Sequence, residues 1–291
     1  MKSPKWSVEE HHRYSHSICF EDVSKDWSGK ILLRSDVHHD NSHCDWDMEK
    51  KHLEMAKEAD APIVDGGDLF CAMQGKWDKR ADTSACRPEH KEGNYLDALV
   101  STASDFYEEY ADQFALISPG NHETSIIKRH ETCLTTRLCE RIRAHSQHCR
   151  LRAGAYSGYI RIKARRKGSN SNYSLVIARH HGYGGGGPVT RGVIQTNRQS
   201  VYQPDADIVW SGHTHDSWQV PISRARLRPN GDVYIDRQVH VKTAGYKDEY
   251  LPHSGWHIER GGPPKPKGAA WLHFWIDRPS EKMHYEIREA L

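Results

Sequence analysis

The feature that most constrains this chain is a pattern that occurs five times: a short apolar run ends, and Asp, Asn or His residues follow at once. The five segments are Asp36-Val37-His38, Gly67-Asp68, Gly120-Asn121-His122-Glu123, His180-His181-Gly182 and Gly212-His213-Thr214-His215. In open α/β sheets, ligands bind outside the carboxyl ends of the strands, so the pattern predicts five strand ends that converge on one site. Glycines beside the polar residues let the backbone turn sharply and approach that site.

The rest of the sequence predicts an α/β alternation followed by a β-rich end. Helical patterns cover 47–59, 95–114 and 125–144, and strand patterns dominate from about residue 157. A hairpin joins 219–228 to 232–243 through a turn at Asn230-Gly231. Because no linker separates two cores, we expect one domain over 1–291. Its motif-bearing core covers about 28–245, and the strands and loop of 246–291 pack on or near that core.

Composition excludes several classes of protein. The chain has 291 residues and no run of 18 apolar residues, so we expect no membrane span and no membrane partner. The first residues lack the apolar region of a secretory signal. A net charge of +2 does not by itself favour nucleic acid. The seven cysteines form no CxxC pair, which predicts free thiols and a reducing, cytoplasmic location.

The residue types in the five segments indicate a metal centre. Imidazoles mixed with carboxylates and one amide suit divalent Mn, Fe or Zn, and the absence of thiolates from the five segments argues against a structural zinc ribbon. Seven such ligands are too many for one ion, but they suit two ions that share a bridging carboxylate.

The ordered set DxH, GD, GNHE, HG and GHTH, over residues 36–215, resembles the calcineurin-like metallophosphoesterase superfamily. The resemblance implies a four-layer α/β/β/α sandwich with a binuclear metal site at one end. It also implies hydrolysis of a phosphate ester by a hydroxide that two metal ions activate. Manganese is the first choice of metal, with zinc, iron and magnesium as alternatives.

The resemblance also assigns roles to residues. The first metal would be held by Asp36, His38, Asp68 and His215, with Asp68 as the bridge, and the second by Asn121, His213 and the His of the HG element. That last ligand is open between His181, which directly precedes the glycine and is preferred, and His180. His122 would protonate the leaving group or stabilise the phosphate, with Asp65 or Glu123 as candidates to orient it.

The residues that follow Gly67-Asp68 indicate which branch of the superfamily the chain resembles. Phosphoprotein phosphatases carry GDxxDRG, whereas this chain continues Leu69-Phe70-Cys71-Ala72-Met73 and lacks the Arg. The GDLF form is closer to the nuclease and phosphodiesterase branches, so we expect a phosphodiesterase with DNA or RNA as candidate substrates. The alternatives are a phosphomonoesterase acting on a small molecule or a phosphoprotein, and a non-catalytic binding scaffold. The sequence does not indicate an oligomeric state.

Three further features of the sequence are candidates for substrate binding or for support of the metal ligands. Substrate contacts are expected from Asn121 and His122, and from the backbone of Gly184 and Gly185, for which a flexible turn is the alternative. Basic runs at 161–167 and at Arg224, Arg226 and Arg228 either track a nucleic-acid backbone or are solvated strand edges. His39 and Asp40 are candidates to hydrogen-bond to the metal ligands without binding the metal themselves.

Overall fold

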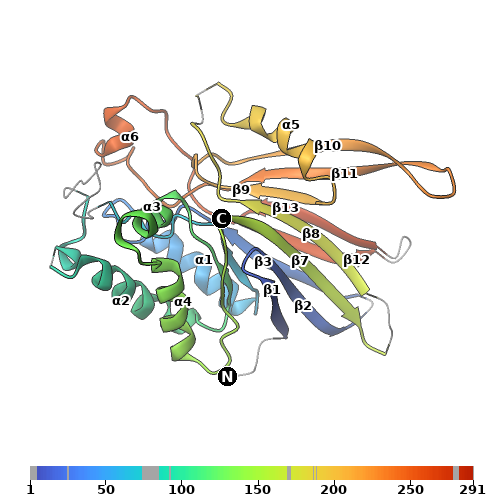
Figure 1. Ribbon diagram of the computed structural model, residues 1–291, viewed down its shortest axis with the longest axis horizontal. Helices are drawn as coiled ribbons and strands as arrows, with labels where there is room; N and C mark the ends of the chain where they lie inside the picture. Colours follow the sequence, from blue (N-terminus) through green and yellow to red (C-terminus); the bar gives the residue numbers. More distant parts are fainter. Residues whose placement is uncertain are drawn as a thin grey trace.

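The computed structural model describes residues 5–24, 26–73, 85–91, 93–168, 172–185, 187, 189–277 and 282–290. Two β-sheets stack face to face, with most of the helices against the outer face of one of them (Figure 1). The sandwich of sheets and helices expected from the resemblance is therefore confirmed. No helix in these ranges is long and apolar enough to cross a membrane, and all seven cysteines are unpaired.

The six-stranded sheet has the strand order β13-β12-β3-β4-β5-β6. Its members are β3 (Ser28–Arg34), β4 (Ile63–Asp65), β5 (Phe114–Ile117), β6 (Arg152–Ala153), β12 (Ala270–Asp277) and β13 (Lys282–Glu289). The strands from β3 to β6 are parallel, and β12 adds to β3 in antiparallel register, with Leu272 opposite Ile31. The C-terminal strands therefore complete this sheet.

The seven-stranded sheet has the order β1-β2-β7-β8-β9-β11-β10. Its members are β1 (Trp6–His12), β2 (Ser15–Val23), β7 (Ser157–Arg166), β8 (Asn172–His180), β9 (Ile208–Ser211), β10 (Trp218–Leu227) and β11 (Val233–Lys242). Side chains of β7 and β10 alternate between more buried and more exposed positions, as expected for strands with one face toward the core. The hairpin predicted at Asn230-Gly231 is confirmed, with Leu227 opposite Val233.

The helices are α1 (Trp46–Glu58), α2 (Tyr95–Tyr107), α3 (Asn121–His130), α4 (Leu134–His145), α5 (Val193–Tyr202) and the single turn α6 (Trp256–Glu259). Two 3₁₀ turns, η1 (Pro88–His90) and η2 (Glu108–Tyr110), flank α2. Helix α1 begins where the Asp45 side chain accepts a hydrogen bond from Met48 N at 3.1 Å. Figure 1 shows α1 to α4 grouped on one side of the sheets and α5 apart from them, beside β10.

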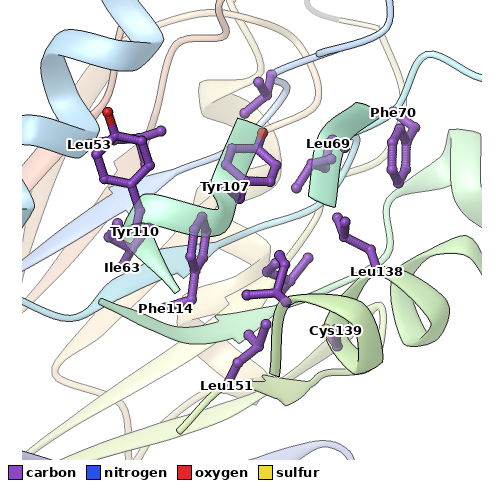
Figure 2. Close-up of a cluster of buried hydrophobic side chains, with 14 of the residues drawn as sticks. Leu53, Ile63, Leu69, Phe70, Tyr107, Tyr110, Phe114, Leu138, Cys139 and Leu151 are labelled. Carbon is purple, nitrogen blue, oxygen red and sulfur yellow. The ribbon is translucent and has the colours of Figure 1, made fainter. Parts of the chain in front are cut away.

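The core has two layers. One lies between the six-stranded sheet and the helices, and Figure 2 shows part of it, including Leu53 of α1, Tyr107 of α2 and Leu138 of α4 around Phe114 of β5. The other lies between the two sheets and includes Ile31, Ile162 and Trp210. Burial of these apolar faces fixes the strand ends, and with them the segments that carry the site.

Two of the predicted helices differ from the structure. The helix expected over 95–114 ends at Tyr107, because Phe114 is buried as the first residue of β5. The helix expected over 125–144 is two helices, separated where Glu131 adopts a left-handed conformation with φ of 54°. The β1–β2 hairpin and α5 were not predicted, since β1 has one fully buried position in seven and no side chain described in α5 is fully buried.

Candidate metal centre

The five polar segments meet at one end of the sandwich. Three of them follow the parallel strands β3, β4 and β5 of one sheet, and two follow β8 and β9 of the other. Backbone hydrogen bonds join segments from different strands: Asp36 N donates to Gly67 O at 2.8 Å, and Gly212 N donates to His181 O at 2.9 Å. The convergence expected from the sequence is therefore a property of the fold.

The first group of candidate ligands consists of Asp36, His38 and His215, whose donor atoms lie within 4.8 Å of one another. His215 Nε2 is 3.3 Å from His38 Nε2 and 3.5 Å from Asp36 Oδ1. These three side chains belong to segments far apart in the sequence, after β3 and after β9. They are the residues that the resemblance assigns to the first metal together with Asp68.

The second group consists of Asp68, His181 and His213, again with donor atoms within 4.8 Å. His181 Nε2 is 3.1 Å from Asp68 Oδ2 and 3.2 Å from Asn121 Oδ1. The structure therefore brings together all four residues that the sequence assigns to a second metal when His181 is the ligand of the HG element.

His180, the alternative ligand, faces a different environment. Its ring packs edge-on against Tyr156 and Tyr183, and its Nδ1 accepts a hydrogen bond from Gly182 N at 3.0 Å. His181 is fully buried against Asp68, whereas His180 is half-buried. The alternation of β8 sends the two rings to different sides, so the structure favours His181.

Five of the candidate ligands have a left-handed backbone. These are Asp36 (φ 54°), His38 (50°), Asp68 (54°), His213 (75°) and His215 (54°). Each such residue costs about 1–3 kcal/mol, and this strain persists only where surrounding contacts hold it. Here His38 N donates to Asp68 O at 3.0 Å, and Tyr246 N donates to Asp36 O at 3.0 Å. Strain of this kind concentrates at functional sites.

Close packing of backbone at two glycines also shapes the centre. A Cβ on Gly67, which has φ of 114°, would lie 2.6 Å from Gly120 N and 2.8 Å from His181 Nδ1. A Cβ on Gly120 would lie 2.5 Å from Asp68 N. Contacts this short require glycine at both positions, which explains the GD and GNHE patterns in physical terms.

One oxygen of Asp36 is left for a cation. Its Oδ2 accepts hydrogen bonds from Ser35 Oγ at 2.5 Å and from His213 N at 2.8 Å. Its Oδ1 is buried and, within the described ranges, accepts no hydrogen bond. A buried carboxylate oxygen without a donor is costly, and a divalent cation would satisfy it.

The electrostatics of the candidate ligands suit bound cations. Burial lowers the pKa of His213 to about 4 and that of His215 to about 3, so both rings are neutral at pH 7. Burial opposes a charge on His181, but the Asp68 carboxylate overrides it and raises the pKa of His181 to about 9. His181 Nδ1 lies 3.2 Å from Gly66 O, an acceptor only, which directs Nε2 toward Asp68. The carboxylates thus favour positive charge where the second metal is expected.

His122 lies beside both groups. Its Nε2 is 3.7 Å from Asp68 Oδ2, and its ring is 5.0 Å from that of His38. Its Nδ1 is 2.5 Å from the carbonyl oxygen of Cys71. A carbonyl can only accept, so Nδ1 carries a proton and Nε2 is the nitrogen on the side of Asp68.

Neither carboxylate expected to orient His122 does so. Glu123 accepts hydrogen bonds from the backbone N–H groups of Asp68 (3.2 Å), Phe70 (2.8 Å) and Gly120 (2.8 Å), and so joins the second and third segments. Asp65 lies 3.0 Å from Arg34 Nε and accepts from Gly67 N. The Cys71 carbonyl takes the expected role, and the sequence held no signal for it because any residue offers a carbonyl.

His39 and Asp40 act at a distance from the ligands. Asp40 accepts hydrogen bonds from Cys71 N at 2.5 Å and Ala72 N at 2.9 Å, so it holds the loop that follows Asp68. His39 Nδ1 is 2.9 Å from Glu49 Oε2 in a buried network around Arg34, whose Nη1 is 2.9 Å from Glu49 Oε1. Both residues support the segments, and neither contacts the ligand groups.

Gly184 and Gly185 lie on the surface just after the HG element, and Gly184 has φ of 75°. The backbone of Gly184 faces His213 and acts to raise its pKa, although burial dominates. This location beside the second group is compatible with the substrate contact expected from the sequence. The other two glycines of the run are Gly186, outside the described residues, and Gly187.

Part of the positive charge on the two basic strands is paired with carboxylates. On β7, Lys163 Nζ is 2.8 Å from Glu9 Oε2 and Arg165 Nε is 2.6 Å from Glu21 Oε2. On β10, Arg224 Nε is 2.7 Å from Asp236 Oδ1. Arg165 pairs in register with Asn172, at the opposite end of β8 from His180. These strands support the alternative interpretation, a solvated sheet protected by charge.

No family model matches the chain, and no curated protein matches it. Similar solved structures include a conserved uncharacterised protein, a predicted phosphoesterase, from Streptococcus pneumoniae TIGR4 (11% identity, 91% of this chain and 99% of that chain, TM-score 0.31). Another is wild-type Vps29 complexed with Zn²⁺ from Entamoeba histolytica (9% identity, 89% of this chain and 98% of that chain, TM-score 0.34). A third is GAP50, the anchor in the inner membrane complex of Plasmodium (8% identity, 90% of this chain and 84% of that chain, TM-score 0.45). At these identities and TM-scores the likeness carries no conclusion about function.

Proposed function

We propose that this protein is a phosphoester hydrolase that uses two divalent cations, one at each ligand group, and His122 as the proton donor. The observation that supports this most directly is the arrangement of the two groups. Asp36, His38 and His215 form one, Asp68, His181 and His213 form the other, and each holds one carboxylate and two imidazoles. His122 Nε2 lies 3.7 Å from Asp68 Oδ2, within reach of a group bound between them.

The side chains fit cations of this kind. Nitrogen and oxygen donors with one amide suit manganese, which remains our first choice, with zinc, iron or magnesium as alternatives. The unsatisfied Asp36 Oδ1 gives the first group a ready anionic donor. Asp68 is the proposed bridge, because it belongs to the second group, its charge raises the pKa of the nearby Asp36, and its backbone oxygen accepts a hydrogen bond from His38 N at 3.0 Å.

When bound, the two cations would supply Lewis-acid chemistry, polarising the phosphoryl group and making water a nucleophile at neutral pH. The protein residues would orient the ester and move the proton. His122 Nε2 would donate a proton to the leaving oxygen, a contribution of about 10²–10⁴-fold. Its ring is held for this by the Cys71 carbonyl. Lys242 Nζ, 2.8 Å from Gly212 O, fixes the loop that presents His213.

Within this class we favour a phosphodiester substrate. The support is the GDLF motif and the two residues after it. Cys71 and Ala72 occupy the positions where the GDxxDRG motif has Asp and Arg. Without that Arg, this loop offers less positive charge to the dianion of a monoester. The paired charges on β7 and β10 weaken the case for DNA or RNA as the substrate. The remaining support for a polymeric substrate is the GDLF motif.

The test is hydrolysis by metal-stripped protein reconstituted with Mn²⁺ or Zn²⁺. Bis(p-nitrophenyl) phosphate reports diesterase activity, and p-nitrophenyl phosphate reports monoesterase activity. We expect turnover of the diester that depends on added metal and is lost in His122→Ala. Turnover of the monoester alone would establish the phosphomonoesterase alternative. Protein that binds no divalent cation in metal analysis would instead establish the scaffold alternative.

A further inference from the structure

A third group of donor atoms adjoins the two proposed metal positions and shares His38 with the first. His38, Cys71 and His122 each place one ligand atom within 4.8 Å of the others. The five motifs do not include Cys71, and the group differs from the other two because it contains sulfur. Two imidazoles and a thiol form a softer donor set than two imidazoles and a carboxylate, and such a set favours zinc, cadmium or cobalt over manganese or magnesium.

His122 is prepared to donate a lone pair to this group. Because Nδ1 donates its proton to Cys71 O at 2.5 Å, the neutral ring has its lone pair on Nε2. Metal-binding histidines commonly have this arrangement, in which a backbone carbonyl fixes the tautomer. His38 also suits the role, since it is 3% exposed and its Nδ1 has no hydrogen-bond partner in the described part of the chain.

Cys71 is held in place at both its backbone and its sulfur. Its N–H donates to Asp40 Oδ1 at 2.5 Å, and Asn41 Nδ2 donates to its Sγ at 3.4 Å. Burial and the nearby Asp40 raise the pKa of the Cys71 thiol, so the sulfur loses its proton only when it binds a cation, and the thiolate is the form that binds metal. The side chain is buried, with 8% of its surface exposed, on the same side of the molecule as the two proposed metal positions.

We propose that Cys71, His38 and His122 form an additional site for a thiophilic divalent cation, and that occupancy of this site inhibits the enzyme. On binding, the Cys71 thiol releases its proton to solvent as the sulfur–metal bond forms. The lone pair of His122 Nε2 is then donated to the cation, so this nitrogen cannot carry the proton for the leaving group. Inhibition rests on the proposed function, whereas binding of the cation does not.

The direct test is titration of metal-stripped protein with Co²⁺, followed by optical absorption. Cobalt bound to nitrogen and oxygen shows only weak visible bands, whereas a cobalt–thiolate bond adds an intense near-ultraviolet charge-transfer band. We expect this band in the wild-type protein and its loss in Cys71→Ser. The matched control is Cys86→Ser, because Cys86 is 7% exposed and its Sγ donates to Arg87 O, outside all three groups.

A second readout is inhibition of the manganese-loaded enzyme by Zn²⁺. The concentration of zinc that halves the rate should rise at least about tenfold in Cys71→Ser and stay unchanged in Cys86→Ser, since loss of even a supporting partner costs about 10–100-fold in metal affinity. If circular dichroism shows that Cys71→Ser is unfolded, His122→Gln replaces it. That variant keeps every thiol, and the cobalt concentration that gives half of the charge-transfer band should rise by the same factor.

The outcomes separate this inference from the proposed function. Cobalt binding without a charge-transfer band, or a band that Cys71→Ser retains, would overturn the additional site while leaving the binuclear centre intact. A band that depends on Cys71 in a protein without hydrolytic activity would support the site and overturn the proposed function. If zinc inhibits wild type and Cys71→Ser equally, the inhibitory role is wrong.

Discussion

Replacing Gly120 with alanine should displace the Asp68 carboxylate. The new Cβ would lie 2.5 Å from Asp68 N and 2.7 Å from Asp68 Cγ, whereas ordinary van der Waals contact begins at 3.4 Å. The two segments would have to separate by about 0.9 Å, the difference between 2.5 and 3.4 Å. Gly120 has φ of −101°, a region open to alanine, so the contact itself is the perturbation.

A displacement near 1 Å costs about 10²-fold in rate when it misplaces reacting groups. We therefore expect kcat/KM of Gly120→Ala on bis(p-nitrophenyl) phosphate to fall about 100-fold. Affinity for Mn²⁺, measured by isothermal titration calorimetry, should fall about 10–100-fold. Overpacking should reduce the free energy of unfolding by about 1–3 kcal/mol, which leaves a folded protein to assay.

The matched control is Gly93→Ala, where a Cβ would meet no atom of the described residues within 4 Å. This variant should bind manganese and turn over substrate as the wild type does. Wild-type metal affinity and rate in Gly120→Ala would contradict the expected displacement of Asp68. An equal loss of affinity in the two glycine variants would also contradict it, because the effect would then not come from the contact with Asp68.

Three further predictions address the ligands and the buried network. His122→Ala should still bind two cations in metal analysis but lose about 10²–10⁴-fold in kcat, and loss of metal would contradict its role as proton donor. Asp68→Asn should impair both metal binding and turnover, and retained activity would exclude Asp68 as the bridge. Glu49 is buried, which opposes its ionisation, but His39 and Arg34 lower its pKa to about 2 from the ordinary 4.5. Because this folded-state pKa is depressed, about 3 kcal/mol of stability should be present above pH 4.5 and lost as the pH falls toward 2. Urea unfolding from pH 2 to 6 should show this loss in the wild type and a weaker dependence on pH in Glu49→Gln.

The local sequence determined several elements because their signals lie within a few residues. Residues 47–59 are strong helix formers behind an Asp45 cap, and α1 forms there. The turn at Asn230-Gly231 fixes the register of β10 and β11. The polar residues after each apolar run likewise lie at strand ends. Because parallel strands place their carboxyl ends at one edge, the sequence could predict that these segments meet.

Only the tertiary structure decided how these side chains are used. The sequence left His180 and His181 open, and the packing of β8 against its neighbours buries one ring against Asp68 and turns the other toward Tyr156. Whether a basic strand is free to bind phosphate depends on partners such as Glu9 and Asp236, which lie on other strands. Such contacts join residues distant in sequence, so no local pattern records them.

The same reason explains why the sequence did not predict the role of Cys71 or the orientation of His122. A backbone carbonyl has no signature in the sequence, yet the Cys71 carbonyl fixes the tautomer of His122 from 51 residues away. The sequence alone therefore determined which residues could serve as donors and at which strand ends they lie. The fold decided which atoms face one another, because burial and strand pairing act between segments that the chain keeps far apart.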